Sequence, residues 1–203
     1  MSAAVSPLEK NQTKCSFTWL IEGQEHELRQ IVGSTGLCPR LLHTFAQITH
    51  LSAKLYIDPR RMAARKLGAV IGTRLDNFWQ WSGLSQGYST TAELLASCEL
   101  DENGKVFTAT KVTELVAESC AASAQVYLYC RMMRKSRRHP HVQRIADRLL
   151  RIIDFLPTSG PLFTSQHKQF RVFVGAVVAV EARHRDIVRR WFLDLVNGTR
   201  GVS

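Results

Sequence analysis

The sequence lacks closely spaced cysteines. Its five cysteines are an odd number, they lie far apart, and none belongs to a CxxC pair. Disulfide frameworks and zinc sites both use regular cysteine spacings, so this pattern argues against each of them. We therefore expect no metal, no cofactor, and thiols kept reduced in the cytosol or nucleus. The cysteines are Cys15, Cys38, Cys98, Cys120 and Cys130.

Long apolar runs and catalytic motifs are also missing. The longest apolar run, Val172–Val180, is too short to cross a bilayer, and no secretory signal is evident at the start. There is no GxSxG elbow, P-loop or GxGxxG motif, which argues against the enzyme classes that carry them. His43 and His50 would lie two helical turns apart, too far to share a metal ion. We expect a soluble intracellular protein that is not an enzyme and has no membrane partner.

Acidic residues are scarce. Seventeen Asp and Glu residues stand against 27 Lys and Arg, which gives a formal net charge of +10 and an isoelectric point near 9.8. Such a surface attracts acidic partners such as nucleic acid, anionic lipid or an acidic protein segment. Solvated arginine faces on an ordinary helical protein explain the same charge, so composition leaves both interpretations open.

What the sequence does contain is helical periodicity. In Pro39–Ile57, apolar residues recur every three to four positions, and the initial proline fits the first turn of a helix. Thr108 or Thr110 can cap a helix that runs to about Arg134. Phe170–Val180 is apolar nearly all round, which predicts a helix buried on every side. We predict an all-α fold, a multi-helix array of packed antiparallel helices. The remaining predicted helices are Arg60–Trp81, Pro140–Leu156 and Glu181–Val196.

We divide the chain into two parts. Residues 1–35 are predicted to be a loosely ordered N-terminal lead-in, because the chain begins with a polar segment. Residues 36–203 are predicted to form one helical domain, since a chain of this length buries one substantial core. Within it, segment 82–106 is rich in Ser, Thr, Gly and Asn and is predicted to connect two helical halves.

The basic residues form clusters, and the densest cluster is the candidate interaction surface. It begins where the helix ending near Arg134 stops, and cations there also complement the partial negative charge of the helix C-terminus. It continues on the next helix as a stripe of arginines at spacings of four and three. The aromatic residues mostly fall on apolar stripes instead, which favours a solvated or partner-facing surface over an independent DNA reader. The surface comprises Arg131, Arg134, Lys135, Arg137, Arg138, Arg144, Arg148 and Arg151.

Three segments, in this order, resemble one protein family. Ala124–Arg131 reads AQVYLYCR, similar to an alanine-rich family helix that ends in a Tyr-Leu-Tyr-Arg type of pattern. His139–Leu156 opens with HPHVQ and continues as a long Leu/Ile helix. Phe170–Val188 is similar to a run that reads Trp-Pro-Leu-Phe-x-Ala-Gly-Cys-Glu-Ala in the family. Together they resemble the fungal-specific transcription factor domain, the helical region that normally follows a zinc binuclear cluster.

The third segment departs from the family pattern at five positions. The first half of the chain resembles the family more loosely, through Gly36–Leu55. The region of resemblance covers about Gly36–Val196. In the third segment the chain keeps Phe173, Ala179, Arg185 and Val188 but has Phe170, Arg171, Ala176, Val177 and Val178 where the family has Trp, Pro, Gly, Cys and Glu.

The resemblance implies a function in transcription regulation. Members act in the nucleus, often over secondary-metabolite or catabolic gene clusters, and the helical region serves regulation, dimer contacts or effector response. The six-cysteine zinc motif is absent from this sequence. We therefore predict a regulator without its own DNA-binding cluster, which contacts other transcription-regulator chains, including as a dimer, and touches DNA only indirectly or nonspecifically. One alternative is a nucleic-acid-binding protein that uses the basic helical faces. Another is a small-molecule binder or an uncharacterised enzyme.

Overall fold

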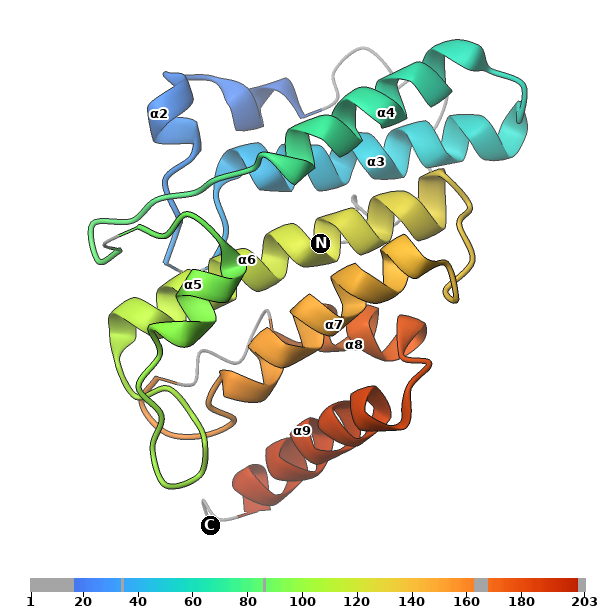
Figure 1. The fold of residues 1–203 in the computed structure, drawn as a ribbon. Helices are drawn as coiled ribbons and strands as arrows, with labels where there is room; N and C mark the ends of the chain where they lie inside the picture. Colours follow the sequence, from blue (N-terminus) through green and yellow to red (C-terminus); the bar gives the residue numbers. More distant parts are fainter. Residues whose placement is uncertain (1–16, 34, 86, 163–167, 201–203) are drawn as a thin grey trace.

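A computed structural model describes residues 17–33, 35–85, 87–162 and 168–200 of the chain. The described residues form helices joined by loops and isolated β-bridges, with no strand among them (Figure 1), which confirms the all-α prediction. The elements are η2 (Thr18–Ile21), α2 (Glu25–Leu28), α3 (Pro39–Ile57), α4 (Met62–Asp76), α5 (Thr91–Ala96), α6 (Ala109–Tyr127), the π-helical turn η3 (Leu128–Met132), α7 (Pro140–Phe155), α8 (Lys168–Val178) and α9 (Ala182–Arg200).

Local signals in the sequence set most helix ends. α3 begins with its proline in the first turn and stops just before Pro59, where helical angles are disfavoured. The side chain of Thr108 accepts a hydrogen bond from the Lys111 amide and caps α6. α4 is shorter than predicted and ends at Asp76, because the backbone beyond it pairs elsewhere. There the Trp81 amide donates to the Arg29 carbonyl over 3.1 Å.

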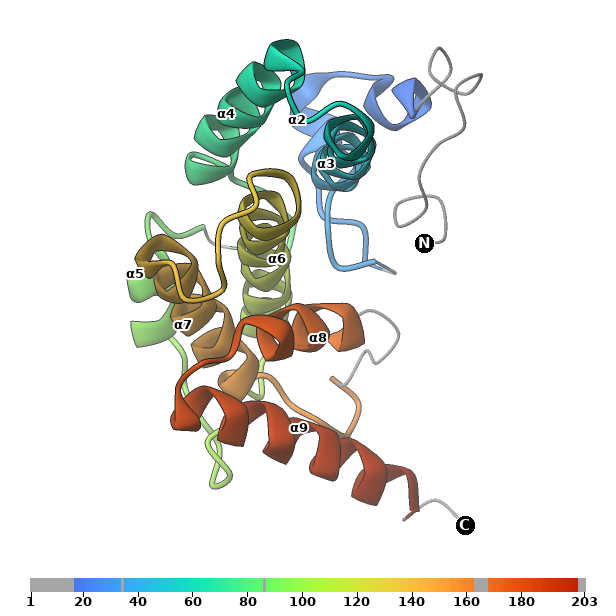
Figure 2. The same cartoon turned by 90° about the vertical axis from the view of Figure 1, so that its right-hand side faces the viewer.

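α6 is the central helix of the fold. The antiparallel pair α3 and α4 lies on one side of it, and α7 and α8 lie on the other (Figure 2). α9 packs beyond them against α7 and α8, at the edge of the molecule farthest from α3 and α4. Short connections join α3 to α4 and α8 to α9, whereas longer ones separate α4 from α5 and α7 from α8.

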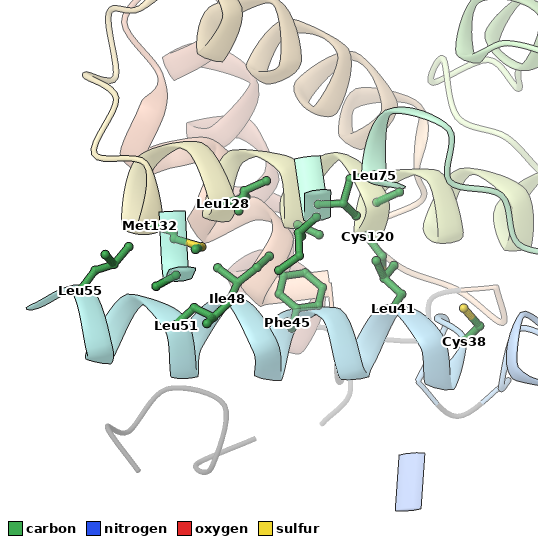
Figure 3. Packing of buried hydrophobic residues seen from close by; sticks show 14 residues of the cluster. Cys38, Leu41, Phe45, Ile48, Leu51, Leu55, Leu75, Cys120, Leu128 and Met132 are labelled. Carbon is green, nitrogen blue, oxygen red and sulfur yellow. The ribbon is translucent and has the colours of Figure 1, made fainter. Parts of the chain in front are cut away.

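The first core cluster joins α3, α4 and the end of α6 (Figure 3). Phe45 and Ile48 of α3 meet Leu75 of α4 and Leu128 and Met132 of η3, and all five side chains are buried. A second cluster fills the space between α6, α7, α8 and α9, and a third lies under α5. Burial of this apolar surface is the main force that holds the helices together.

Gly68 of α4 lies against Met132 of η3. A Cβ on Gly68 would lie 2.7 Å from the Cε atom of Met132, closer than real Cβ atoms come. Gly68 weakens α4 as an isolated helix by about 1 kcal/mol. Its missing side chain is what allows the buried methionine to reach this part of α4.

α8 corrects one expectation from the sequence. Val172, Val174 and Val178 are buried as predicted, but Phe173 and Val177 are 61% and 52% exposed. The prediction assumed that a helix with apolar residues all round packs against other helices on every side. In the structure α6, α7 and α9 cover only part of α8, so one apolar face stays open.

The two segments predicted to be least regular contain short helices. Of the N-terminal lead-in, residues 1–16 lie outside the described residues, and the rest includes η2 and α2, with η2 packed against α3. The connection 82–106 contains α5, capped by the side chain of Thr90, with Leu94 buried. Along the described chain, every helix is too short or too polar to span a bilayer.

Candidate partner-binding surface

The densest group of cations lies in the turn between α6 and α7. The π-helical turn η3 widens the end of α6, and the Met133 amide reaches back to the Leu128 carbonyl over 3.0 Å. Arg134 then adopts a left-handed conformation (φ 52°), which is uncommon for a residue with a side chain. The chain turns outward here, and this turn, residues 131–138, is called the basic turn below. All five predicted cations of the basic turn are exposed: Arg131, Arg134, Lys135, Arg137 and Arg138.

The arginines of α7 do not all reach the same surface. Arg144 and Arg151 are exposed, and an Arg144 nitrogen lies 3.2 Å from Nδ1 of His141. Burial, and to a lesser degree the charge of Arg144, hold the pKa of His141 below its usual value. A neutral imidazole can accept the hydrogen bond from Arg144. Arg148 is half-buried instead, and its guanidinium donates a hydrogen bond to Gln125 of α6.

Arg148 belongs to a polar network between four parts of the chain. It donates to Oε1 of Gln125 on α6, and its Nε lies 3.9 Å from the Glu118 carboxylate. The Gln125 side-chain amide donates to Asp76 at the end of α4 over 2.9 Å. The hydroxyl of Tyr88, from the connection before α5, donates to Glu118. This network links α4, α6, α7 and the connection behind the basic surface, and sequence reasoning missed it.

Glu114 is a second acidic residue that α6 buries. Its carboxylate accepts a hydrogen bond from the Ser85 hydroxyl over 2.6 Å and lies 2.9 Å from Nζ of Lys111. Buried carboxylates need such partners to compensate for lost hydration. A sequence signal did exist, since Glu114, Glu118 and Gln125 recur at helical spacing on an otherwise apolar helix. Each of the three side chains forms a hydrogen bond to a neighbouring segment of the chain.

The cysteines that the structure describes are free thiols. Cys38 and Cys120 are buried, and burial raises the pKa of Cys38 to about 11. Burial also raises the pKa of Cys120, although the guanidinium of Arg171 lies 2.9 Å from its sulfur and opposes the shift. Thiols with raised pKa values are weak nucleophiles and weak metal ligands. Cys15 lies outside the described residues.

Metal-binding clusters are equally absent from the described residues, where no three His, Cys, Asp or Glu side chains gather around a common point. The nitrogen Nε2 of His184, near the start of α9, lies 3.2 Å from the Asp147 carboxylate. His139 uses its imidazole to cap α7 by accepting from the amide of His141. Both histidines therefore have structural partners.

Exposed apolar side chains gather on the two C-terminal helices. Phe173 and Val177 lie on one face of α8, one helical turn apart. Phe192, Leu193 and Val196 of α9 are 40% to 48% exposed, while Trp191 of the same helix is buried in the core. α8 and α9 pack against each other, and exposed apolar patches on a protein mark contact sites for other macromolecules. We call these five exposed side chains the apolar face.

Comparison with protein families identifies the class of protein. The chain matches the family described as the fungal specific transcription factor domain over residues 7–202. The chain belongs to this family. The match confirms the resemblance, and the family is one of transcription regulators rather than enzymes. Searches of curated proteins and of solved structures gave no match.

The structure explains what the family-like HPHVQ segment does in this fungal transcription factor domain. Pro140 occupies the first turn of α7, where its missing N–H is harmless. Gln143, one turn later, donates to the carbonyl of Val178 over 2.8 Å and also to the carbonyl of Arg137. The Gln143 side chain thus connects the start of α7 to both the basic turn and the end of α8. The same hydrogen bonds therefore hold the segments that carry the basic turn and part of the apolar face.

Proposed function

We propose that this chain regulates transcription through protein contacts, with the apolar face of α8 and α9 binding an acidic, partly apolar segment of another transcription-regulator chain. The observation that carries the proposal is the open face of α8. Phe173 and Val177 are exposed on a helix whose other apolar side chains are largely buried. Leaving such side chains in water forgoes a burial free energy of about 1.5–3 kcal/mol for each, which a partner would recover.

The charge of the domain supports an acidic partner over a second copy of the same chain. The molecule carries a formal charge of +10, so two copies repel each other. Exposed arginines of α9, among them Arg185 and Arg189, accompany the apolar side chains on this helix. Electrostatic complementarity of this kind speeds association and selects partners of opposite charge. In this proposal, the protein acts in the nucleus, over a secondary-metabolite gene cluster.

A direct interaction with DNA is the competing function, and the basic turn is what favours it. Phosphate contacts by arginine are strong at low salt but carry little sequence information. We expect the purified chain to bind mixed duplex DNA weakly, without sequence preference, and to release it by about 150 mM salt. Sequence-selective binding in the nanomolar range at that salt concentration would contradict the proposal and make the chain a DNA reader.

The proposed contact can be tested with a reporter gene in fungal cells. The chain is fused to an unrelated DNA-binding domain, and the variants V177D and V70D are compared. Both valines are exposed in helices, at 52% on α8 and 44% on α4, so each substitution adds one charge to a similar site. We expect V177D to abolish reporter regulation and V70D to retain it, with unchanged melting temperatures for both. Equal regulation by the two variants, or none by the unmodified chain, would contradict the proposal.

A further inference from the structure

A cavity of about 610 Å³ lies between the N-terminal segment, α3 and α4. Its lining residues come mainly from η2, α2, the first half of α3 and the second half of α4, and Figure 1 shows how α2, α3 and α4 are arranged. Its volume is in the range of pockets that hold small organic molecules. None of its lining residues belongs to the apolar face or to the basic turn, and α9 lies at the opposite end of the molecule from α3 and α4 (Figure 2).

Positive charge dominates the walls of the cavity. Three guanidinium groups and one carboxylate line it, a net charge of +2. The carboxylate belongs to Glu25, which pairs with Arg29 over 2.8 Å and also with Arg40. Arg74 is exposed and forms no hydrogen bond or ion pair with any described residue. The one carboxylate therefore pairs with two of the three cations, and an anion in the cavity would meet the guanidinium of Arg74, which has no ion-pair partner among the described residues.

Two polar groups at this cavity form no hydrogen bond with the described residues, and one of them, the Nε of Arg40, is a buried atom. His43 is only 8% exposed and lines the cavity, yet its imidazole forms no hydrogen bond within the described parts of the chain. The buried Nε of Arg40 is also without a hydrogen-bond partner among the described residues. For the Nε of Arg40 the unmade hydrogen bond costs about 1–3 kcal/mol, since buried polar groups are nearly always hydrogen-bonded. A ligand with hydrogen-bonding oxygens would satisfy both groups.

The state of His43 suits such a ligand. Burial, reinforced by the charge of Arg40, lowers the pKa of its imidazole, which keeps the ring neutral near pH 7. A neutral imidazole presents one N–H donor and one acceptor nitrogen. The three guanidinium groups repel a metal cation, whereas they match the oxygens of carboxylates and phosphates.

The remaining walls are apolar. Ile71, Leu75 and Phe78 of the α4 region line the cavity together with the cations. We propose that this cavity binds a small organic anion, whose carboxylate or phosphate head contacts Arg29, Arg40 and Arg74 and whose apolar body rests on Ile71 and Phe78. Bound there, the anion bridges α2, α3 and α4. This inference goes beyond the proposed partner contact and does not depend on it.

Isothermal titration calorimetry with three probes of one shape tests this inference. The probes are naphthalene-2-carboxylate, 2-naphthyl phosphate and the neutral naphthalene-2-carboxamide, in about 150 mM salt to screen surface charge. We expect at least one anion to bind and the amide not to bind. Binding by the carboxylate identifies an organic acid, and binding by the phosphate alone identifies a phosphate ester. Equal binding of all three probes, or binding of none, would overturn the proposal.

A matched pair of variants places the binding in this cavity. R74Q removes one cation from the cavity, and R60Q removes one from the exposed loop before α4, where Arg60 forms no ion pair with a described residue. Neither arginine is buried, so both variants are expected to fold. R74Q should weaken anion binding by about tenfold or more, because a hydrogen bond to a charged group is lost, and R60Q should not. Equal affinities for the two variants would place the anion elsewhere and refute the assignment.

Discussion

Two arginines of α7 look equivalent in the sequence but have different environments in the structure. Replacing each by methionine therefore distinguishes an effect on the free energy of unfolding from an effect on surface charge. Arg148 donates to Gln125, whose side chain is 4% exposed, and lies near the Glu118 carboxylate. Arg151, one turn later, is exposed and forms no ion pair within the described residues. R148M and R151M each remove one positive charge from the same helix.

The expected difference in the free energy of unfolding follows from these contacts. In R148M, the buried Oε1 of Gln125 loses its charged donor, which costs about 1.5–3 kcal/mol. The Glu118 pair adds less than about 1 kcal/mol, since its atoms are 3.9 Å apart and Arg148 is partly exposed. Methionine keeps the apolar contacts of the arginine stem, so a total near 2 kcal/mol is expected. R151M should change stability by less than about 0.5 kcal/mol.

Urea denaturation followed by circular dichroism measures this difference. For a chain of this size, about 2 kcal/mol lowers the melting temperature by roughly 4–8 °C, so a thermal scan gives an independent value. In the DNA titration at low salt, R151M should weaken nonspecific binding by removing an exposed charge. If R148M were as stable as R151M, the network around Arg148 would have no energetic role and the reasoning would fail.

Three further predictions concern backbone and protonation. G36A should lower the free energy of unfolding by about 2 kcal/mol, because this residue has φ 68° and an added Cβ would lie 2.5 Å from a valine methyl of α6. A urea midpoint equal to that of the unmodified chain would count against this prediction. R134G should raise stability by about 0.5 kcal/mol, since glycine accepts the left-handed conformation more readily, and a lower melting temperature would contradict this. The pKa values of His43, His50 and His141 are all lowered in the folded chain, first by burial. Below pH about 6.5 these histidines bind protons in the unfolded chain but not in the folded chain. The free energy of unfolding should therefore fall as the pH decreases from 7 to 5.5, and urea midpoints measured across this range test the prediction.

Much of the local structure was predictable because local signals determine it. The proline and apolar stripe of α3 and the threonine cap of α6 depend on neighbours within one or two turns, and both predictions agree with the structure. The end of α4 was predicted too late, since Trp81 pairs with Arg29, a residue far away in the sequence. The basic turn was recognisable as a cluster of charge in one short segment. Its place on any partner interface stays a prediction.

The amino-acid sequence by itself determined the helical class, the basic surface charge and the family, because periodicity, composition and ordered motifs are properties of the chain alone. Only the tertiary structure decided which apolar and charged side chains remain available. Phe173 and Val174 are adjacent and apolar, yet the packing of α8 buries one and exposes the other. Arg148 and Arg151 belong to one stripe, yet only Arg148 meets a buried glutamine. Whether a side chain faces water depends on helices that come together from distant parts of the sequence, and that arrangement is a property of the whole fold.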